Sequence, residues 1–361
     1  MVKSLLYCVS AATLGAAMLT SASAQQAPRP GGVAAGPPVG VRALPALPPG
    51  LDPLTASPTA RLQYAIPPEP DADAAPEAHA KWVKAVTALA KPRTAPTLTQ
   101  TNISNGPMRP VAGVEANSDK STSYNWSGTA FTSKKTPWTV EAIEQEFTVP
   151  VAQQAFGSCT GGWDYSSVWP GIDGYSSDDV LQAGIEVDAY CNGGSTSSFY
   201  GAWVEWYPYD ETSVSDPAVN PGDLIYIEVW NTSSTTGYAE IWNETTDSPG
   251  YEYSLTAYPG YPLVGNSVEW IAERPGVNGG LATLTNYIFV ASAYGVAWNY
   301  LEPTKKQTDY WQGGKPSSGF YKITMLDNNG DGISTPIVEN YSFVWDYNYG
   351  SSYDSTKRST Q

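Results

Sequence analysis

The stretch VLQAGIEVD, residues 180–188, alternates apolar and polar positions along its whole length. Successive residues of a β-strand point to opposite faces, so this pattern predicts a strand with one apolar face for the core. That face contains Leu181, Ala183, Ile185 and Val187. The opposite face contains Gln182, Gly184, Glu186 and Asp188.

Two other stretches, GAWVEWYP (residues 201–208) and SVEWIAER (residues 267–274), have the same alternation. The face away from their apolar positions carries Trp203, Glu205, Glu269 and Glu273. A solvated outer face normally carries Lys, Thr and Ser. Aromatic rings beside carboxylates and an amide instead favour the floor of a cleft.

The rest of the chain after Asp119 continues this pattern. Short runs rich in Val, Ile, Tyr, Trp and Thr lie between turns rich in Gly, Pro, Asn and Asp, and no long helical pattern interrupts them. We therefore predict an all-β domain over residues 119–361, built as a two-sheet antiparallel β-sandwich.

The N-terminal part divides into two predicted segments. Residues 1–24 have a basic start, an apolar run and the small residues Ala22-Ser23-Ala24, which together predict a secretory signal peptide. Export as a secreted (extracellular) protein follows, and no later apolar run is long enough to anchor the chain in a membrane. Residues 25–118 have the Pro/Ala-rich composition of a largely unstructured pro-region or linker.

One piece of this leader differs from its surroundings. The stretch PEAHAKWVKAVTAL, residues 76–89, begins with Pro and spaces its apolar residues as a helix does. It is either a short helix that docks on the body or a transient helix in a disordered leader.

Charge is distributed unevenly along the chain, whose formal net charge is −16. Most acidic residues follow Asp119, whereas the leader is slightly basic. An acidic body excludes nucleic acid as a partner and suits work at low pH. The opposite signs also predict that the leader docks on the body at neutral pH as its own inhibitor, which makes the chain a zymogen, and that acid weakens this attraction.

The chain contains a single histidine, His79, and it lies in the leader. The body therefore has no imidazole, which excludes Ser-His and Cys-His nucleophilic pairs and zinc sites built on histidine. We expect no metal and no cofactor. Any chemistry in the body must use carboxylates, amides and hydroxyl groups.

Two cysteines, Cys159 and Cys191, remain after removal of the signal peptide. An even number of cysteines in an oxidising compartment favours a disulfide between them. The alternative is a pair of buried free thiols.

Six motifs along the body carry a resemblance to a known family. They are NWSG (125–128), VWPGIDG (168–174), VLQAG (180–184), AWVEWYP (202–208), PGD (221–223) and VEWIAER (268–274). In this order and spacing they resemble the glutamic peptidases, or eqolisins, of the scytalidoglutamic and aspergilloglutamic type. The resemblance covers essentially the whole body.

The resemblance implies a concanavalin A/lectin-like jelly roll and an acid-active endopeptidase with a Gln/Glu dyad. The dyad falls on Gln182 and Glu269. Substrate-binding or supporting residues fall on Trp169, Asp173, Glu186 and Glu205, and Trp203 joins them from the mixed strand face. The chain departs from the family pattern at Glu186, Gly201 and Arg274, which leaves the supporting residues less well defined than the dyad.

The dyad is also chemically reasonable by itself. Peptide hydrolysis needs a base for water, a donor for the oxyanion and an acid for the leaving amine. Ionised Glu269 can accept a proton from water and return it to nitrogen, while the Gln182 amide can stabilise the oxyanion and orient the water. The structural alternative is that both are ordinary strand residues.

Rival functions also fit parts of the pattern. A sandwich with aromatic residues and the carboxylates Glu205 and Glu269 also describes a secreted glycoside hydrolase, and a non-catalytic carbohydrate-binding lectin-like module is the third possibility. The stretch DNNGDG, residues 327–332, is either a calcium loop or, more simply, a hairpin turn. We expect protein or peptide substrates and a monomer; cleavage specificity, maturation site, pH optimum and glycosylation are not readable from the sequence.

Overall fold

The computed structural model of the chain describes residues 37–111, 119–132, 141–155, 159, 161–299, 310–339 and 342–347. The predicted signal peptide, residues 1–24, lies outside this part of the chain. No helix within the described ranges is long and apolar enough to cross a membrane.

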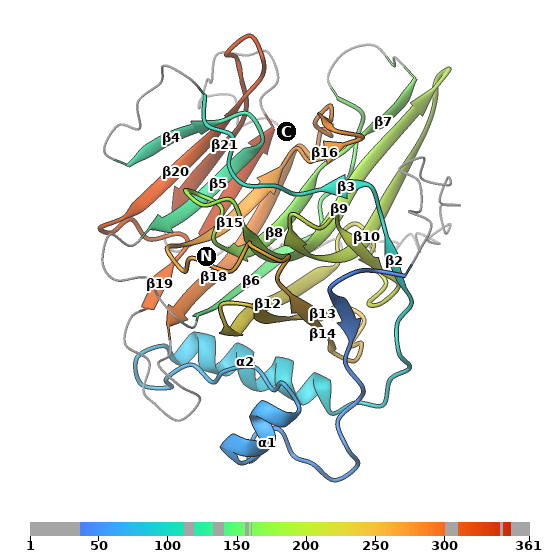
Figure 1. Ribbon diagram of the computed structural model, residues 1–361. Coiled ribbons are helices and arrows are strands. Elements are labelled where there is room, and N and C mark those ends of the chain that lie inside the picture. The colour runs from blue at the N-terminus through green and yellow to red at the C-terminus, as the bar shows by residue number, and fades with distance from the viewer. Residues whose placement is uncertain are drawn as a thin grey trace, which may run out of the picture.

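The strands form two layers, which are defined by strand pairing and include β1 (Val41–Ala43) and β2 (Leu98–Gln100) of the leader. The first layer, the site sheet, contains in spatial order β2, β11 (Thr212–Val214), β10 (Ser195–Tyr207), β9 (Val180–Asn192), β8 (Ser167–Ile172), β15 (Ser267–Glu273), β5 (Trp126–Thr132) and β20 (Phe320–Leu326). The second layer, the helix-side sheet, contains β1, β14 (Tyr251–Thr256), β13 (Thr236–Asn243), β12 (Leu224–Ser233), β6 (Glu141–Thr148), β18 (Phe289–Asn299) and β22 (Ser342–Tyr347). All these neighbours are antiparallel, which confirms the predicted all-β sandwich (Figure 1).

Shorter strands complete the two layers. The strand β21 (Gly332–Glu339) pairs with both β20 and β22 and so joins the sheets at one side. The remaining elements are β4 (Lys120–Ser123), which runs parallel to β20, β7 (Gly162–Asp164) beside β9, β19 (Tyr310–Gln312) beside β18, and a small sheet of β3 (Ile103–Ser104), β16 (Gly276–Val277) and β17 (Gly280–Leu281).

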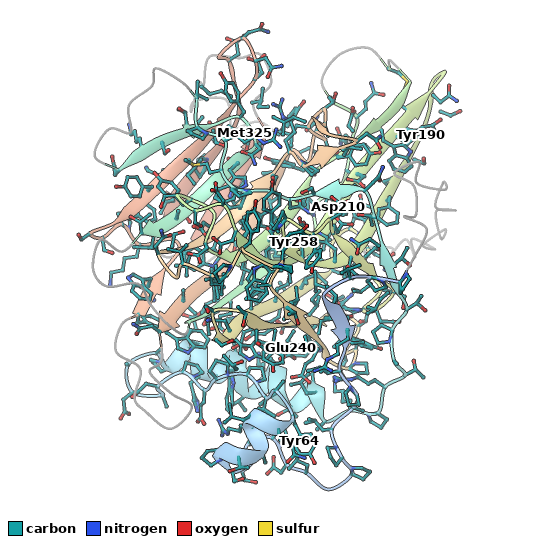
Figure 2. The ribbon with its side chains drawn as sticks, in the orientation of Figure 1. Tyr64, Tyr190, Asp210, Glu240, Tyr258 and Met325 are labelled. Carbon is teal, nitrogen blue, oxygen red and sulfur yellow. A yellow bond between two sulfur atoms is a disulfide. The ribbon has the colours of Figure 1, made fainter. Side chains whose placement is uncertain are left out.

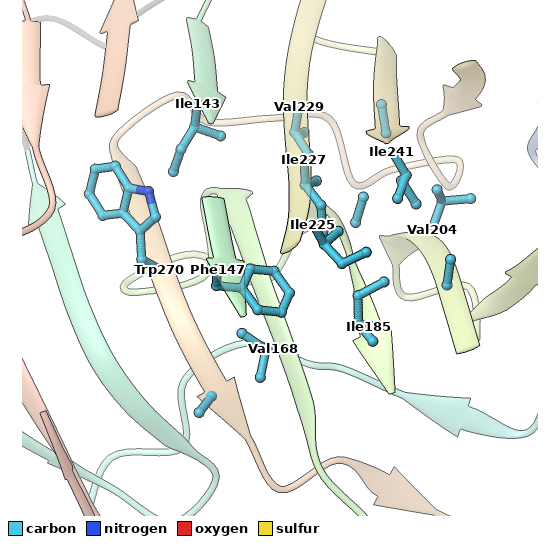
Figure 3. Close-up of a cluster of buried hydrophobic side chains, with 14 of the residues drawn as sticks. Ile143, Phe147, Val168, Ile185, Val204, Ile225, Ile227, Val229, Ile241 and Trp270 are labelled. Atoms are coloured by element: carbon cyan, nitrogen blue, oxygen red, sulfur yellow. The ribbon is translucent and has the colours of Figure 1, made fainter. Parts of the chain in front are cut away.

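The main core lies between the two sheets. Figure 3 shows Val168, Ile185 and Val204 of the site sheet facing aliphatic side chains of β6, β12 and β13. Leu181, Ala183, Ile185 and Val187, assigned to the core face from their alternation, are all buried there. Full burial of one such Val, Ile or Leu side chain contributes roughly 1.5–3 kcal/mol, so this layer supplies much of the stability of the sandwich.

One helix of the leader, α2 (Pro76–Leu89), covers the outer face of the helix-side sheet, and a shorter helix, α1 (Pro58–Gln63), lies against α2. Figure 1 shows α1 and α2 below β12 and β13. The second helix begins with Pro76 at its first position, where the missing backbone N–H is not needed. Its bounds confirm the predicted docking helix.

The leader is more ordered than its Pro-rich composition indicates, because the body supplies the apolar partners that it lacks. On α2, Ala85 and Ala88 are buried against Tyr226 and Trp242 of the sheet. Small alanine side chains let the helix approach the aromatic rings closely. Residues 37–111 therefore fold both by packing on the sandwich and around a small cluster of their own, in which Ile66, Trp82, Val86 and Leu89 are buried.

A row of four glutamates lies on this same outer face beneath the leader. Glu144, Glu228, Glu240 and Glu252 stand opposite one another on β6, β12, β13 and β14, and all are buried. Glu240 is labelled in Figure 2, between the strands and the helices. Burial is the largest cause that raises the pKa of each, to about 8 for Glu144 and for Glu252.

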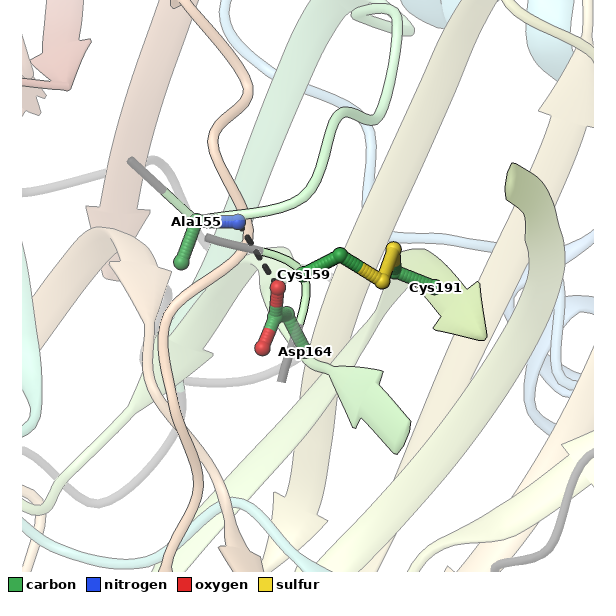
Figure 4. The surroundings of a disulfide bond; sticks show 4 residues. All are labelled: Ala155, Cys159, Asp164 and Cys191. Atoms are coloured by element: carbon green, nitrogen blue, oxygen red, sulfur yellow. Dashed lines mark hydrogen bonds between the residues drawn. A yellow bond between two sulfur atoms is a disulfide. The ribbon is translucent and has the colours of Figure 1, made fainter. Parts of the chain in front are cut away.

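A disulfide joins Cys159 and Cys191, as predicted, with 5.6 Å between the two Cα atoms. Figure 4 shows the bond beside the loop in which the Ala155 N–H donates to Asp164 Oδ2 at 2.7 Å. The bridge ties this loop to the far end of β9.

The DNNGDG stretch forms a hairpin turn between β20 and β21. The Asp327 carboxylate accepts hydrogen bonds from the N–H groups of Asn329 and Asp331 at 2.8 and 2.9 Å. These internal bonds account for the turn and agree with the hairpin interpretation.

Candidate functional site

A single row of residues crosses the outer face of the site sheet. Glu205, Gln182, Gly171, Glu269 and Ala130 stand opposite one another on β10, β9, β8, β15 and β5. Because neighbouring strands lie about 4.8 Å apart, the backbones of Gln182 and Glu269 are roughly 10 Å apart. Gly171 lies between them and puts no side chain in the space that separates them.

Both members of the predicted dyad are fully buried. Gln182 Oε1 and both carboxylate oxygens of Glu269 lack a well-formed hydrogen bond among the described residues. Buried polar atoms are normally satisfied, so three such atoms on either side of Gly171 mark a place for a polar ligand or a water molecule.

The environment of Glu269 disfavours its charged form. Burial raises the pKa of Glu269 well above its ordinary value, and the nearby charge of Asp173 acts in the same direction. The Ser267 side chain and the Tyr175 backbone amide lower the pKa only in part. A carboxyl group in this setting holds its proton when the site is closed to water.

Two tryptophans shape the site beside the dyad. A Cβ atom on Gly184 would lie 2.5 Å from the Trp203 ring and 2.8 Å from Trp169 Cβ, so only glycine fits between the two side chains. A Cβ atom on Gly171 would lie 2.7 Å from the Trp169 ring. The two glycines therefore let Trp169 and Trp203 lie flat against the strands next to the dyad.

The carboxyl group of Glu273 holds Trp169 in place. Glu273 lies on β15, on the same face as Glu269 and four residues further along the strand. Its two oxygens accept bonds from Asn125 Nδ2 at 2.9 Å and from Trp169 Nε1 at 3.0 Å. Trp126 packs edge-on against Trp169 with 5.1 Å between ring centroids. Burial raises the pKa of Glu273 well above its ordinary value, so it accepts these bonds without needing a full charge.

The predicted supporting residue Asp173 holds the loop that leads into β15. Its carboxylate accepts the backbone N–H groups of Gly265 at 2.7 Å and of Asn266 at 2.8 Å. Burial, followed by the charge of the neighbouring Asp173, raises the pKa of Asp179 to about 8. The pair fixes the start of the strand that carries Glu269.

Glu186 and Glu205 lie at different distances from the dyad. Glu186 is buried on β9 two rows from Gln182, opposite Gly201 and Ser167. Glu205 lies next to Gln182 in the same row. All seven predicted dyad and supporting residues thus lie on the site sheet or its adjoining loop, while the disulfide lies apart at its end.

A segment of the leader crosses the site. Gln182 Nε2 donates a hydrogen bond to the backbone carbonyl of Asn105. Glu205 Oε2 accepts the backbone N–H of Asn105 at 3.0 Å. One residue further, the Gly106 carbonyl accepts Trp126 Nε1 at 3.0 Å. The peptide backbone is therefore held directly against one member of the dyad.

The sequence did not identify five residues that lie at the site. They are Asn105, Asn125, Ser167, Glu211 and Glu273. Two of them could have been predicted from the sequence. Strand alternation places Glu273 on the same face as the dyad, and Asn125 begins the NWSG motif. Nothing local marks Asn105, because its partners lie about 60 to 110 positions further along the chain.

Comparison with known proteins gives one family and a small set of relatives. Residues 124–293 match the model of the Peptidase A4 family. The chain is 32% identical over 167 residues to aspergillopepsin-2 of Aspergillus niger, covering 42% of this chain and 56% of that protein. It is 33% identical over 142 residues to scytalidopepsin B of Scytalidium lignicola, covering 39% of this chain and 46% of that protein. The chain thus spans about half the length of these curated relatives.

Two solved structures superpose in part on this chain. Scytalido-glutamic peptidase bound to a transition state analog inhibitor superposes with a TM-score of 0.49 at 21% identity, covering 62% of this chain and 98% of that chain. Aspergilloglutamic peptidase from Aspergillus niger superposes with a TM-score of 0.39 at 24% identity, covering 51% of this chain and 99% of that chain.

Proposed function

This chain is a relative of the glutamic peptidases of the Peptidase A4 family through residues 124–293, and from this premise we propose that it is an acid endopeptidase with Gln182 and Glu269 as its dyad. The observation that carries the proposal is the row in which these two side chains flank Gly171. Their buried oxygens, which lack a well-formed hydrogen bond, supply the acceptors that a hydrolytic water needs.

The proposed mechanism uses both side chains. Glu269 accepts a proton from the attacking water and passes it to the leaving nitrogen. The Gln182 amide N–H stabilises the oxyanion, as its bond to the Asn105 carbonyl supports. An amide does not titrate, so this donor persists in acid.

Ionisation of Glu269 is linked to opening of the site. Burial is the largest cause that raises its pKa, and the leader contributes to the covering of this face. When the leader leaves and water enters, the pKa of Glu269 falls toward its ordinary value near ~4.3, which makes it a usable base in mild acid.

The same proposal covers maturation and location. Residues 1–24 direct secretion, residues 25–118 form the pro-region, and residues 119–361 form the peptidase domain. The contacts of Asn105 with Gln182 and Glu205 support the pro-region as the inhibitor of its own enzyme. Protein or peptide substrates would take the place of this segment.

Glycoside hydrolysis receives no support from the geometry. Glu205 and Glu269 are separated in their row by both Gln182 and Gly171. Their backbones are thus three strand steps, or roughly 14 Å, apart, and Glu205 is bonded to the leader.

The experiment that tests the proposal compares substrates and variants at one acid pH. The matured protein should digest casein at about pH 4.5, where a carboxyl group with the ordinary pKa of ~4.3 is more than half ionised, and should leave xylan and β-glucan intact. Glu269→Gln should abolish digestion, whereas Glu244→Gln on the opposite side of the sandwich should not. Sugar release without peptide release would overturn the proposal.

A further inference from the structure

The side chain of Asn105 is buried in a polar pocket of the body. Its Nδ2 donates to Glu205 Oε2 at 3.2 Å and to Glu211 Oε2 at 3.5 Å. Its Oδ1 accepts Ser167 Oγ at 2.6 Å. The exposed fraction of Asn105 is 0%, so these three side chains enclose it.

The backbone on both sides of Asn105 is held as well. Its N–H donates to Glu205 at 3.0 Å and its carbonyl accepts the Gln182 amide. The next carbonyl, of Gly106, accepts Trp126 Nε1, and Asn125 Nδ2 donates to the Pro107 carbonyl at 3.1 Å. The bond between Asn105 and Gly106 therefore lies against Gln182, one member of the dyad, with hydrogen bonds before and after it.

The pocket is complementary to a carboxamide and to few other side chains. Two carboxyl groups accept from the NH₂ group, and a hydroxyl donates to the carbonyl oxygen. An aspartate would place an acceptor against Glu205 and Glu211. An apolar side chain would remove all three side-chain hydrogen bonds in this buried pocket and leave Glu205 only its bonds from Ser104 and the Asn105 N–H, and such a loss gives strong discrimination.

The position after Asn105 favours a small residue. A Cβ atom on Gly106 would lie 3.2 Å from the Tyr207 ring, closer than ordinary contact. Alanine fits only if the ring shifts, and larger side chains fit less well.

We propose that the pocket of Ser167, Glu205 and Glu211 is a specificity subsite that selects asparagine as the residue before the cleaved bond, and that the bond between Asn105 and Gly106 is the maturation site. This inference rests on the proposed peptidase function. Water adds to the Asn105 carbonyl carbon as Glu269 takes its proton. The bond to the Gly106 nitrogen then breaks, and that nitrogen receives the proton, leaving a carboxyl group on Asn105 and an amine on Gly106.

Peptides test the specificity without changing the enzyme. The probe is an internally quenched peptide with the sequence of residues 101–109, in which position 105 is Asn, Asp, Ala or Leu. We expect kcat/KM for Asn to exceed the others by about tenfold or more, with cleavage before Gly106 by mass. A peptide with Asn102→Ala is the matched control and should be cleaved as fast as the parent.

The precursor tests the maturation site. Wild-type precursor incubated in acid should yield a new N-terminus at Gly106, Asn105→Ala should slow its formation, and Asn102→Ala should not. Glu269→Gln precursor, incubated in parallel, measures spontaneous scission at the Asn-Gly sequence. Equal peptide rates for Asn and Ala, or a new N-terminus elsewhere, would overturn the subsite. Failure of the wild type to cut casein or any peptide faster than Glu269→Gln would instead overturn the proposed function.

Discussion

Trp169 donates its indole N–H to Glu273 Oε2 at 3.0 Å, from one strand of the site sheet to the next. Asn125, just before β5, holds the other oxygen of the same carboxyl group. One buried acid thus ties three neighbouring strands together beside the dyad, and it fixes the ring that limits the space above Gly171.

Replacing Trp169 by Phe keeps a ring but removes its donor. We expect the loss of about 1–3 kcal/mol in free energy of unfolding, because a buried Glu273 oxygen is left without its partner. Urea unfolding of the full chain measures it. Trp163→Phe on β7, which is only half-buried, is the control and should change little. Equal urea midpoints for Trp169→Phe and Trp163→Phe would contradict a stabilising role for the hydrogen bond between Trp169 and Glu273.

Removal of either dyad member should leave a folded and inactive protein. Glu269→Gln and Gln182→Ala are each expected to lower peptidase activity at least ~100-fold, the scale for loss of a general base or an oxyanion donor. Activity on casein, together with circular dichroism to establish folding, decides the outcome. Full activity of either variant would end the assignment.

Adding one methyl group at Gly171 should impair the site. Its Cβ would lie 2.7 Å from the Trp169 ring and 3.3 Å from Gln182 Cβ, so both side chains must shift. We expect Gly171→Ala to reduce kcat/KM by about tenfold or more, since small misplacements of reacting groups are costly. Gly280→Ala, where a Cβ meets nothing within 4 Å, is the matched control. Identical kinetics for the two variants would show that the space around Gly171 is unimportant.

The pH dependence of leader docking follows from the glutamate row. Burial, to which the docked leader contributes, raises the pKa of Glu144 and of Glu252 to about 8. The stabilisation is complete below the ordinary glutamate pKa of ~4.3 and is lost as pH rises from there through about 8. The sequence predicts the opposite direction, in which acid weakens docking by reducing the negative charge of the body. The buried row gives stronger docking in acid because the carboxyl groups on this face outnumber the leader cations Lys81 and Arg93 that face them.

Hydrogen exchange of α2 measures this effect. We expect faster exchange at about pH 9 than at about pH 5 after correction for intrinsic rates, and a smaller difference in Glu228→Gln, which removes one titrating group. Asp52→Asn is the control, because Asp52 lies in the leader outside the row and bonds locally to Leu54 and Thr55. Exchange that slows as pH rises would mean that net charge outweighs the buried carboxyl groups.

The disulfide makes a chemical prediction. Intact-mass analysis should show no alkylation of Cys159 and Cys191 before reduction and two labels after it. Reduction should destabilise the chain by roughly 3–4 kcal/mol in the chain-entropy estimate for a loop of this size. Two labels without reductant would exclude the bridge in the native protein.

Strand alternation was enough to put Gln182, Glu205 and Glu269 on one face, because the direction of a side chain in a strand is a local property. The register that places Gly171 between two of them is not local. It depends on how β8 pairs with β9 and β15, which lie far apart in sequence. A one-residue slip would have reversed every side chain.

The leader shows the same limit more strongly. Its composition predicts residues that build no core of their own, whereas Ile66, Trp82 and Leu89 lie in a small buried cluster within the leader. The partners of Asn105 and of α2 are supplied by strands that follow much later in the chain. Only the helix within Pro76–Leu89 was predictable, since its apolar spacing is contained in the segment itself.

The leader contacts both outer faces of the sandwich, with α2 on the helix-side sheet and the segment around Asn105 on the site sheet. Cleavage at the proposed site beside Gln182 would therefore cut the chain without releasing the leader. The elements α2, β1 and β2 keep their own contacts with the body. Cutting and departure become separate kinetic events. The immediate product is a nicked two-chain complex, whose lifetime, rather than the rate of cutting, sets how soon the cleft becomes free.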